Sequence, residues 1–228
     1  MAATTLGVSP GRLIEGYTLT LRSEGKSPKT VQFHAGNLRR FLWYARQKGW
    51  GEDIREIGEW RVREFLAYVA EAEHRWGLVG NGARSSTARA SHATVWHYFV
   101  TLRVFFTWLV REGFLVKAPT SGLKLRRPSP PVTEPYTPDQ IRAMLRVCDW
   151  DYEHSAKLLG SRNRAILLIL LDTGVRLSEL CHIRMQDLDR DTGLVKVVGK
   201  DRQERMVRIG LVARRGVWRY LLHRPDNE

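Results

Sequence analysis

The sequence predicts a mainly α-helical protein: an N-terminal helical bundle, then a C-terminal α/β domain of mostly helices with one small antiparallel β-hairpin or sheet. Three observations carry this prediction. Apolar residues in the first 115 positions recur at intervals of four and three, as they do on one face of a helix. A proline-rich segment then interrupts the helical pattern, and two β-rich runs occur only near the C-terminus.

The N-terminal bundle is expected over residues 8–116. Two of its four helix signatures begin with a Ser-Pro pair, Ser9-Pro10 and Ser27-Pro28, which suits the N-cap and first helical positions. Three apolar stripes keep the helical spacing: Val31, Ala35, Leu38, Leu42 and Ala45; Val62, Phe65, Leu66 and Val69; and Val95, Phe99, Leu102, Phe106 and Leu109. Such stripes form the core of a helical bundle far more often than they line a cofactor site.

A linker is expected over residues 117–135, because five prolines in this segment prevent a continuous helix. Three cations lie in its middle: Lys124, Arg126 and Arg127. A basic strap between two domains could follow a DNA duplex, whereas an ordinary stiff linker would leave these charges solvated. The sequence favours neither interpretation over the other.

The C-terminal domain is expected over residues 136–228 and begins with helices. Thr137-Pro138 is typical of a helix start. The apolar run of the next helix ends at Leu171, and Gly174 is the natural stop for that helix. A third, short helix is predicted from Arg176 to about Arg184.

A β-hairpin and a last helix complete this domain. Leu194–Val198 and Met206–Ile209 are β-rich runs, and the polar residues between them predict a turn. The helix that follows should turn Val217, Tyr220 and Leu221 inward, so Tyr220 is expected to be a structural tyrosine.

The charge of the chain points to a polyanionic partner. A net charge of +13 and a pI near 10.2 are large for 228 residues, and the cations are spread over both halves of the sequence. Nucleic acid is the extended polyanion that such a surface most simply fits. A basic protein that merely stays soluble is the alternative.

No segment of the sequence predicts membrane insertion. The longest unbroken apolar stretch, Ala165–Leu171, is far shorter than the roughly 20 residues that span a bilayer, and the N-terminus lacks the layout of a signal peptide. We therefore expect a cytoplasmic protein. Cys148 and Cys181 form no CxxC pair, which favours two reduced thiols inside helices over a disulfide or a metal site.

Arg176 and Lys200 are the candidates for chemistry on phosphate. Phosphodiester exchange without a metal needs fixed cations around the non-bridging oxygens, an acid for the leaving hydroxyl and a nucleophile. Arg176 follows a predicted helix stop and could grip two oxygens, while Lys200 lies in the predicted β-turn and could deliver a proton. Either residue alone would be a weak signal.

The flanking residues resemble the tyrosine recombinase family of phage integrases and bacterial Xer-like recombinases. Thr173–Leu180 is similar to the family's first catalytic-arginine box, and Met185–Asp189 is similar to the segment that continues it. Val197–Arg205 resembles the family's lysine-bearing β-hairpin. Ser27–Thr30 and Phe105–Leu109 resemble its N-terminal SAM-like core-binding domain, so the likeness covers nearly the whole chain.

The resemblance implies a role for each matching residue. Arg176 would be the first transition-state arginine, Glu179 the partner that supports it, and Lys200 the general acid for the leaving 5′ hydroxyl. The family's reaction joins a tyrosine to a 3′ phosphate and needs no metal or other cofactor. The implied partners are double-stranded DNA and other recombinase protomers bound to it. The resemblance implies no membrane partner and no small-molecule substrate, and it places the protein at the nucleoid.

The sequence departs from the family pattern after Lys200. None of its seven histidines is followed by arginine at the third position, so no His-x-x-Arg box is present, and Tyr220 comes too early to match the nucleophile. The resemblance therefore suggests a recombinase cut short and catalytically incompetent as this chain. The alternative is a non-catalytic DNA-binding decoy or regulator of recombination sites.

Leu170–Gly174 also resembles the hydrophobic-Asp-Thr-Gly loop of retroviral-type aspartic proteases. That loop follows a β-strand in an all-β fold and supplies one carboxylate of a like-charged pair. Because the residues before Asp172 predict a long helix, we do not favour a protease.

Candidate DNA contacts lie near predicted helix starts, where free backbone N–H groups attract phosphate. Lys29 and Thr30 are near one such start, and Arg39 and Arg40 would extend that surface. Arg84, Ser86, Thr87 and Arg89 are near another. The linker cations described above complete the predicted set.

Overall fold

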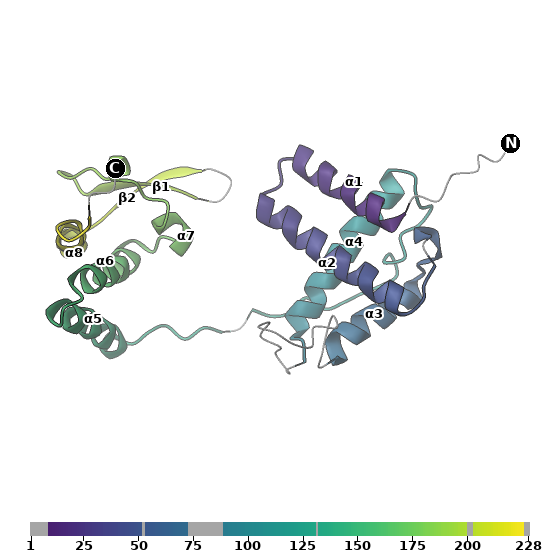
Figure 1. The fold of residues 1–228 in the computed structure, drawn as a ribbon, viewed down its shortest axis with the longest axis horizontal. Helices are drawn as coiled ribbons and strands as arrows, with labels where there is room; N and C mark the ends of the chain where they lie inside the picture. The colour runs from purple at the N-terminus through teal and green to yellow at the C-terminus, as the bar shows by residue number, and fades with distance from the viewer. Residues whose placement is uncertain (1–8, 52, 73–88, 131, 200–202, 226–228) are drawn as a thin grey trace. The chain divides into compact units, whose positions relative to one another are not determined.

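The computed structural model describes residues 9–51, 53–72, 89–130, 132–199 and 203–225. The chain divides into two compact units, Met1–Pro131 and Val132–Glu228. Helices dominate both units, and one two-stranded sheet lies in the second, which confirms the predicted mainly α fold class (Figure 1).

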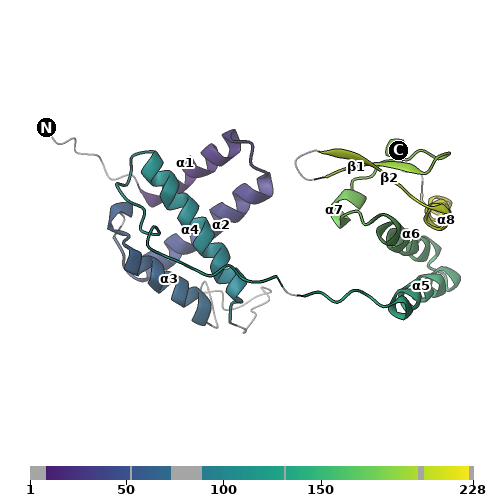
Figure 2. The same ribbon diagram turned by 180° about the vertical axis from the view of Figure 1, so that it is seen from behind.

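The first unit is built from helices (Figures 1 and 2). Its described elements are α1 (Pro10–Ser23), α2 (Pro28–Gln47), the short 3-10 helix η1 (Ile54–Glu56), α3 (Glu59–Glu71) and α4 (His92–Arg111). The Ser-Pro pairs mark the helix starts as predicted, because Ser9 and Ser27 are the N-cap residues of α1 and α2. The Ser27 hydroxyl accepts the backbone N–H of Thr30 at 3.2 Å, which satisfies one free donor of the first turn.

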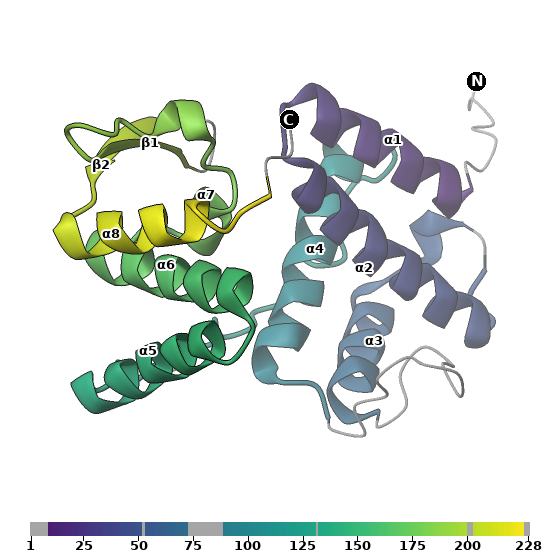
Figure 3. The ribbon, with the colours of Figure 1, turned by 60° about the vertical axis from the view of Figure 1, so that its left-hand side comes forward.

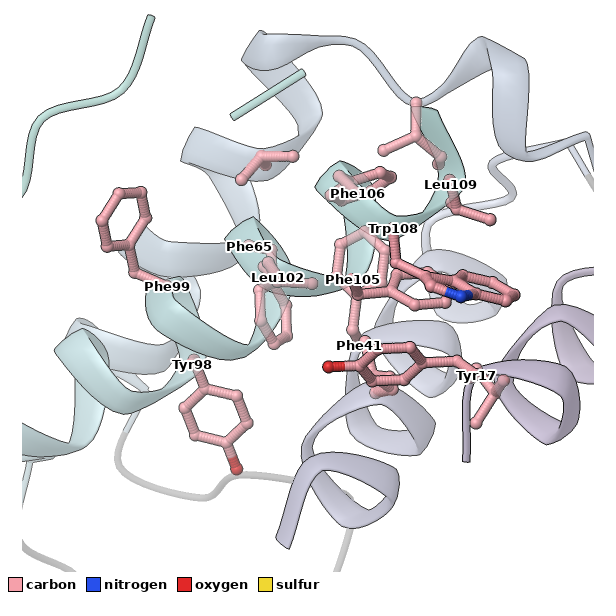
Figure 4. Close-up of a cluster of buried hydrophobic side chains, with 14 of the residues drawn as sticks. Tyr17, Phe41, Phe65, Tyr98, Phe99, Leu102, Phe105, Phe106, Trp108 and Leu109 are labelled. Carbon is pink, nitrogen blue, oxygen red and sulfur yellow. The ribbon is translucent and has the colours of Figure 1, made fainter. Parts of the chain in front are cut away.

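Aromatic side chains fill the core of the first unit, as Figure 4 shows. Phe41 of α2, Phe65 of α3 and Phe106 of α4 are fully buried, and the Phe41 and Phe65 rings meet edge to face with their centroids 5.0 Å apart. This is a favoured geometry for aromatic pairs. The three predicted apolar stripes therefore face one another in a shared core, with only Leu42 partly exposed.

Helix α4 is the most apolar helix of the first unit. By length and composition it could cross a membrane, but half of its apolar window is buried inside the protein. The buried residues include Phe99, Leu102 and Leu109, which belong to one hydrophobic core with residues of α1, α2 and α3 (Figure 4). The hydropathy of α4 is therefore accounted for by its place at the centre of a helical unit.

The proline-rich segment after α4 contains no helix in residues 117–130, as its prolines predict. Its first half is nevertheless packed on the first unit, since Thr120 and Leu123 are buried and Leu123 belongs to the core. Apolar side chains in an extended segment gain by covering a neighbouring core. Leu125 packs partly buried against the same core and is the last described linker residue to do so.

The second unit contains α5 (Pro138–Glu153), α6 (Lys157–Thr173), α7 (Leu177–Leu180), η3 (Met185–Asp187), β1 (Leu194–Val198), β2 (Glu204–Arg208) and α8 (Leu211–Leu221). Helix α6 packs against both α5 and α8 (Figure 3). Strands β1 and β2 pair antiparallel, with Leu194 opposite Arg208 and Val198 opposite Glu204. Val195 and Val197 are alternate residues of β1, so both face the core, which they share with Val217 of α8.

Local signals explain the helix boundaries of the second unit. Thr137 and Gln140 form a reciprocal capping box at the start of α5. Gly174 ends α6 with a positive φ of 63°, which a residue without Cβ adopts at little cost. At Gly160 a Cβ would lie 2.5 Å from the Cys148 carbonyl oxygen, so this glycine permits the close approach of α6 to α5.

Three details differ from the sequence prediction. Helix α7 ends at Leu180 and does not reach Arg184, because the Asp187 carboxylate accepts the Arg184 backbone N–H and starts η3 instead. Strand β2 begins at Glu204 and ends at Arg208, whereas Met206–Ile209 was predicted. Both cysteines are free thiols, but Cys181 follows the last residue of α7 and is exposed, so it does not lie inside a helix.

Candidate functional site

Arg176 occupies the N-cap position of α7, immediately after the reversal that Gly174 makes at the end of α6. Its backbone N–H donates to Glu179 Oε2 at 2.9 Å, and its Nη1 donates to Glu179 Oε1 at 2.9 Å. One carboxylate therefore fixes both the main chain and the guanidinium of Arg176. This charge-assisted pair limits the rotamers that the arginine adopts.

Glu179 is almost completely buried, with 2% of its surface exposed. Arg205 of β2 supplies two further hydrogen bonds, from Nη1 to Oε1 at 2.9 Å and from Nη2 to Oε2 at 2.8 Å. These bonds, followed by the Arg176 backbone N–H, lower the pKa of Glu179 from 4.5 to about 2. Glu179 is therefore ionised across the neutral range, and its carboxylate raises the pKa of Arg205 in return.

Arg205 was not among the residues predicted from the sequence. The expected role of Glu179 could have pointed to it. A glutamate that is buried beside an arginine needs more hydrogen-bond donors than one guanidinium provides, so a second cation is expected nearby. Arg205 pairs with Val197 across the hairpin, so it projects from the strand that follows the predicted lysine turn.

The guanidinium of Arg176 remains available to a ligand. Its side chain is 69% exposed, and only Nη1 is bonded to a protein group within the described residues. The other N–H groups of a planar fork held in this way can donate to two oxygens of one phosphate. Arg176 and Glu179 are thus brought together by direct hydrogen bonds, while their roles in a reaction stay a prediction.

Lys200 lies outside the residues that the structure describes. Its neighbour Gly199 is described: the Gly199 backbone N–H donates to the Gln203 carbonyl oxygen at 2.7 Å, at the base of the turn. A Cβ built on Gly199 would lie 3.1 Å from Glu179 Oε1. The residue that precedes the lysine in the sequence therefore lies against the carboxylate that holds Arg176.

The predicted contact residues of the first unit are arranged along α2 and before α4. Lys29 is exposed and Thr30 half-buried in the first turn of α2, and Arg39 is exposed further along the same helix. Arg40 Nη1 donates to the Tyr98 hydroxyl at 3.0 Å, which ties α2 to α4. Arg89 is exposed two residues before the N-cap of α4, whereas Arg84, Ser86 and Thr87 lie outside the described residues.

The linker cations lie on the surface. Lys124 and Arg126 have no carboxylate partner within the part of the chain that the structure covers. The Arg127 guanidinium lies over the Trp96 ring at 5.8 Å from its centroid. Among the described residues, no group of three or more His, Cys, Asp and Glu side chains could hold a metal ion.

Asp172, the acid of the protease-like run, is in the last turn of α6, not at the end of a strand. Its carboxylate accepts the backbone N–H of Gly210, the N-cap of α8. Asp172 therefore joins α6 to the start of α8 and has a structural explanation.

Comparison with family models identifies both units. Residues 135–228 match the model described as "Phage integrase family", and residues 14–113 match "Phage integrase, N-terminal SAM-like domain". The two matches together cover most of the chain.

Curated relatives include two bacterial proteins named tyrosine recombinase XerC. That of Xylella fastidiosa strain M23 is 31% identical in an alignment of 209 residues that covers 89% of this chain and 61% of the relative. That of Xanthomonas campestris pv. campestris strain B100 is 32% identical in an alignment of 198 residues that covers 86% of this chain and 54% of the relative. The chain thus spans 54–61% of the length of these relatives.

Two solved structures share the fold at low sequence identity. The Tn1549 transposon integrase in complex with circular intermediate DNA has a TM-score of 0.65 at 19% identity, covering 97% of this chain and 67% of that chain. The XerH site-specific recombinase bound to palindromic difH substrate has a TM-score of 0.60 at 20% identity, covering 93% and 57%.

Proposed function

Because the chain belongs to the phage integrase family of tyrosine recombinases, we propose that it binds duplex DNA at sites of site-specific recombination. In this proposal residues 8–116 are the core-binding domain, 117–135 the linker, and 136–228 part of the catalytic domain. The XerC relatives, and the solved integrase and XerH complexes with DNA, support the assignment.

The held guanidinium of Arg176 is the observation that carries the proposal. The buried Glu179 carboxylate, which binds both Arg176 and Arg205, fixes the Arg176 side chain. Most N–H donors of the Arg176 guanidinium stay exposed. Negative charge moves over the non-bridging oxygens during phosphoryl transfer, and a fixed cation lowers the energy of that state because it need not reorganise. A merely solvated arginine would lack this support.

The remaining roles follow the family reaction. In that reaction a tyrosine hydroxyl gives up its proton to a base and its oxygen bonds to the 3′ phosphorus, while the bond from phosphorus to the 5′ oxygen breaks. A lysine in the position of Lys200 would donate the proton that the 5′ oxygen takes up. Arg176 would stabilise the phosphate oxygens throughout this exchange. Since these 228 residues contain no His-x-x-Arg box and no tyrosine that matches the nucleophile, we propose that they bind DNA without cutting it.

The first unit would supply most of the binding energy through phosphate contacts. Lys29 and Arg39 are exposed on α2, and the net charge of +13 favours association with a polyanion. Other recombinase protomers on the same DNA would be its protein partners, as the lambda integrase dimer bound to a core site suggests. Such a protein would act in the cytoplasm, where it would associate with the nucleoid.

A salt series tests the binding. We expect the logarithm of the association constant for duplex DNA to fall linearly with the logarithm of salt concentration, because bound phosphates release counterions. The double variant Lys29→Ala, Arg39→Ala should reduce that slope by about two, since each cation would neutralise roughly one phosphate. Arg22→Ala, an exposed arginine at the end of α1, is the matched control and should leave the slope unchanged. Salt-independent binding would refute the proposal.

A cleavage assay with the same protein tests whether it cuts DNA. A nicked duplex traps any covalent protein–DNA adduct, and we expect no adduct from these 228 residues. An adduct would show that a nucleophile is present after all.

A non-catalytic regulator that occupies recombination sites is the second candidate, since the basic first unit could bind such a site by itself. Such a protein would compete with an intact recombinase for the same DNA. Added to a recombination reaction of an intact relative, it should lower product formation in proportion to its occupancy of the site. Unchanged product at saturating occupancy would exclude this role.

A further inference from the structure

Helix α2 has one surface face whose residues follow the helical repeat. Lys29, Phe33, Gly36 and Arg40 succeed one another at intervals of four, three and four residues, so they lie in one row. Lys29, Phe33 and Arg40 are exposed, and Gly36 is half-buried. We call this row the α2 face. Its two ends are cationic and its centre is uncharged.

Phe33 is an exposed aromatic residue held in place by a second helix. Its side chain is 44% exposed, whereas Phe41 and Tyr44 of the same helix are buried in the core. The Phe33 ring meets the ring of His97 on α4 edge to face, with the centroids 5.6 Å apart. This contact limits the positions of the ring without covering it. Phe33 therefore presents a fixed apolar surface to the outside of the first unit.

Gly36 is a glycine that the packing of the first unit does not require. A Cβ built on it would meet nothing within 4 Å, in contrast to Gly160, where a Cβ would lie 2.5 Å from a carbonyl oxygen. Gly36 is also inside a regular helix, where glycine is less favourable than alanine. A remaining use for the missing side chain is the close approach of the helix backbone to a partner.

The charges around this centre indicate the partner. Helix α2 contains no Asp or Glu, and the whole chain carries a net charge of +13. Lys29 and Arg40 are separated by about 16 Å along the helix axis. The major groove of DNA is about 12 Å wide, admits a helix, and has phosphates along both edges and base edges between them. A row with cations at its ends and an uncharged centre complements that arrangement.

We propose that the α2 face reads base sequence in the major groove, with Phe33 in contact with the 5-methyl group of a thymine and Gly36 letting the backbone approach the base edges. The proposal rests on the duplex binding proposed above and adds the residues that select the sequence. Phosphate contacts carry no direct sequence information, whereas apolar contact with the thymine methyl group distinguishes thymine from the other bases.

Removal of single methyl groups from DNA tests the contact. A preferred duplex is selected from a randomised pool with the 228-residue chain, and its thymines are then replaced one at a time by deoxyuridine, which lacks only the methyl group. We expect at least one replacement to weaken binding about fourfold, the change that burial of one methyl group gives. Phe33→Ala should bind that deoxyuridine duplex and the thymine duplex equally.

Two comparisons separate this contact from general binding. Leu19→Ala changes an exposed leucine of α1 and should keep the thymine preference. Phe33→Ala should leave the salt dependence of binding unchanged, because the ring neutralises no phosphate. A thymine preference that survives in Phe33→Ala, or a duplex that binds with no sensitivity to deoxyuridine, overturns the readout and leaves the proposed DNA binding intact. Failure to bind any duplex overturns both.

Gly36→Ala tests the close approach independently of folding. We expect a higher melting temperature for the first unit, because alanine favours the helix. Binding of the selected duplex should nevertheless weaken by a factor on the order of ten, comparable to the loss from one mismatched base pair. Gly11→Ala in α1 is the control, since a Cβ there meets only the Ser9 hydroxyl at 4.0 Å, and it should leave the affinity unchanged. Unchanged affinity of Gly36→Ala would refute the close approach.

Discussion

Arg205 of β2 grips Glu179 of α7 with both terminal nitrogens of its guanidinium, at 2.9 and 2.8 Å. The same carboxylate holds the side chain and backbone of Arg176. The turn that bears Arg176 and the hairpin that bears the predicted lysine are therefore joined through one buried acid. A change on either side of this connection should disturb the other.

Arg205→Lys tests the bidentate grip. Lysine keeps the charge but is a point donor that cannot match both carboxylate oxygens, so we expect a lower melting temperature for the second unit. Arg208→Lys is the control, because Arg208 lies on the same strand and is exposed, and its one hydrogen bond among the described residues is a long contact of 3.4 Å to the Thr192 carbonyl oxygen. Equal melting temperatures for the two variants would contradict a special role for Arg205.

The ionisation of Glu179 predicts acid sensitivity. Its pKa in the folded chain is about 2, below the ordinary 4.5, so the charged form stabilises the fold. That contribution is complete above pH 4.5 and is lost as the pH falls toward 2. Thermal melts from neutral pH down to the pKa of Glu179 should show Glu179→Gln less stable than wild type at neutral pH, with the difference shrinking in acid. A difference independent of pH would argue against the ion pair.

The aromatic core of the first unit should be sensitive to truncation. Phe106 is fully buried in α4, and replacing it by alanine removes the transfer energy of the ring and leaves a cavity, at a cost of about 3–5 kcal/mol. Val104 of the same helix is partly exposed, and Val104→Ala should change stability by no more than about 0.5 kcal/mol. Urea denaturation measures both, and similar values would show that the core is wrongly assigned.

Asn37 of α2 and Thr101 of α4 form a buried polar pair, in which Asn37 Nδ2 donates to Thr101 Oγ1 at 3.1 Å. Thr101→Val keeps the shape but leaves the amide without its acceptor, which should cost about 1–3 kcal/mol in urea denaturation. The double variant Asn37→Leu, Thr101→Val removes both polar groups and should recover part of that loss. Strict additivity of the two single changes would mean that the pair is not coupled.

The second unit has an apolar hollow of about 470 Å³ beside α6, α7 and α8. Leu177 lines it and is 65% exposed, so the native chain should bind a hydrophobic dye. Leu177→Ser should lower the dye fluorescence. Leu19→Ser changes an equally exposed leucine of α1 outside this hollow, and an equal loss in that control would show that the dye does not report on it.

Local features explain why much of the fold was predictable. Ser27-Pro28, Thr137-Pro138 and Gly174 act within a few residues, so the helices begin and end near the predicted positions. The end of α7 was not predictable in this way. It depends on the Asp187 carboxylate, which competes for the Arg184 backbone N–H and starts a separate turn.

The candidate site was predicted in part. Arg176 and Glu179 are three residues apart in one turn, so their pairing could be expected from the chain itself. Arg205 is 26 residues from Glu179, and no local pattern joins them. Their contact arises because the hairpin packs against α7 in the folded unit.

The sequence by itself determined the helical fold class, the family and the Arg176 turn, because apolar periodicity, helix caps and a short motif are local properties of the chain. Only the tertiary structure decided that Arg205 completes the hydrogen bonds around Glu179 and that Leu123 covers the first unit's core. Each of these joins side chains from different elements. Such contacts depend on how helices and strands pack, and packing is a property of the whole fold.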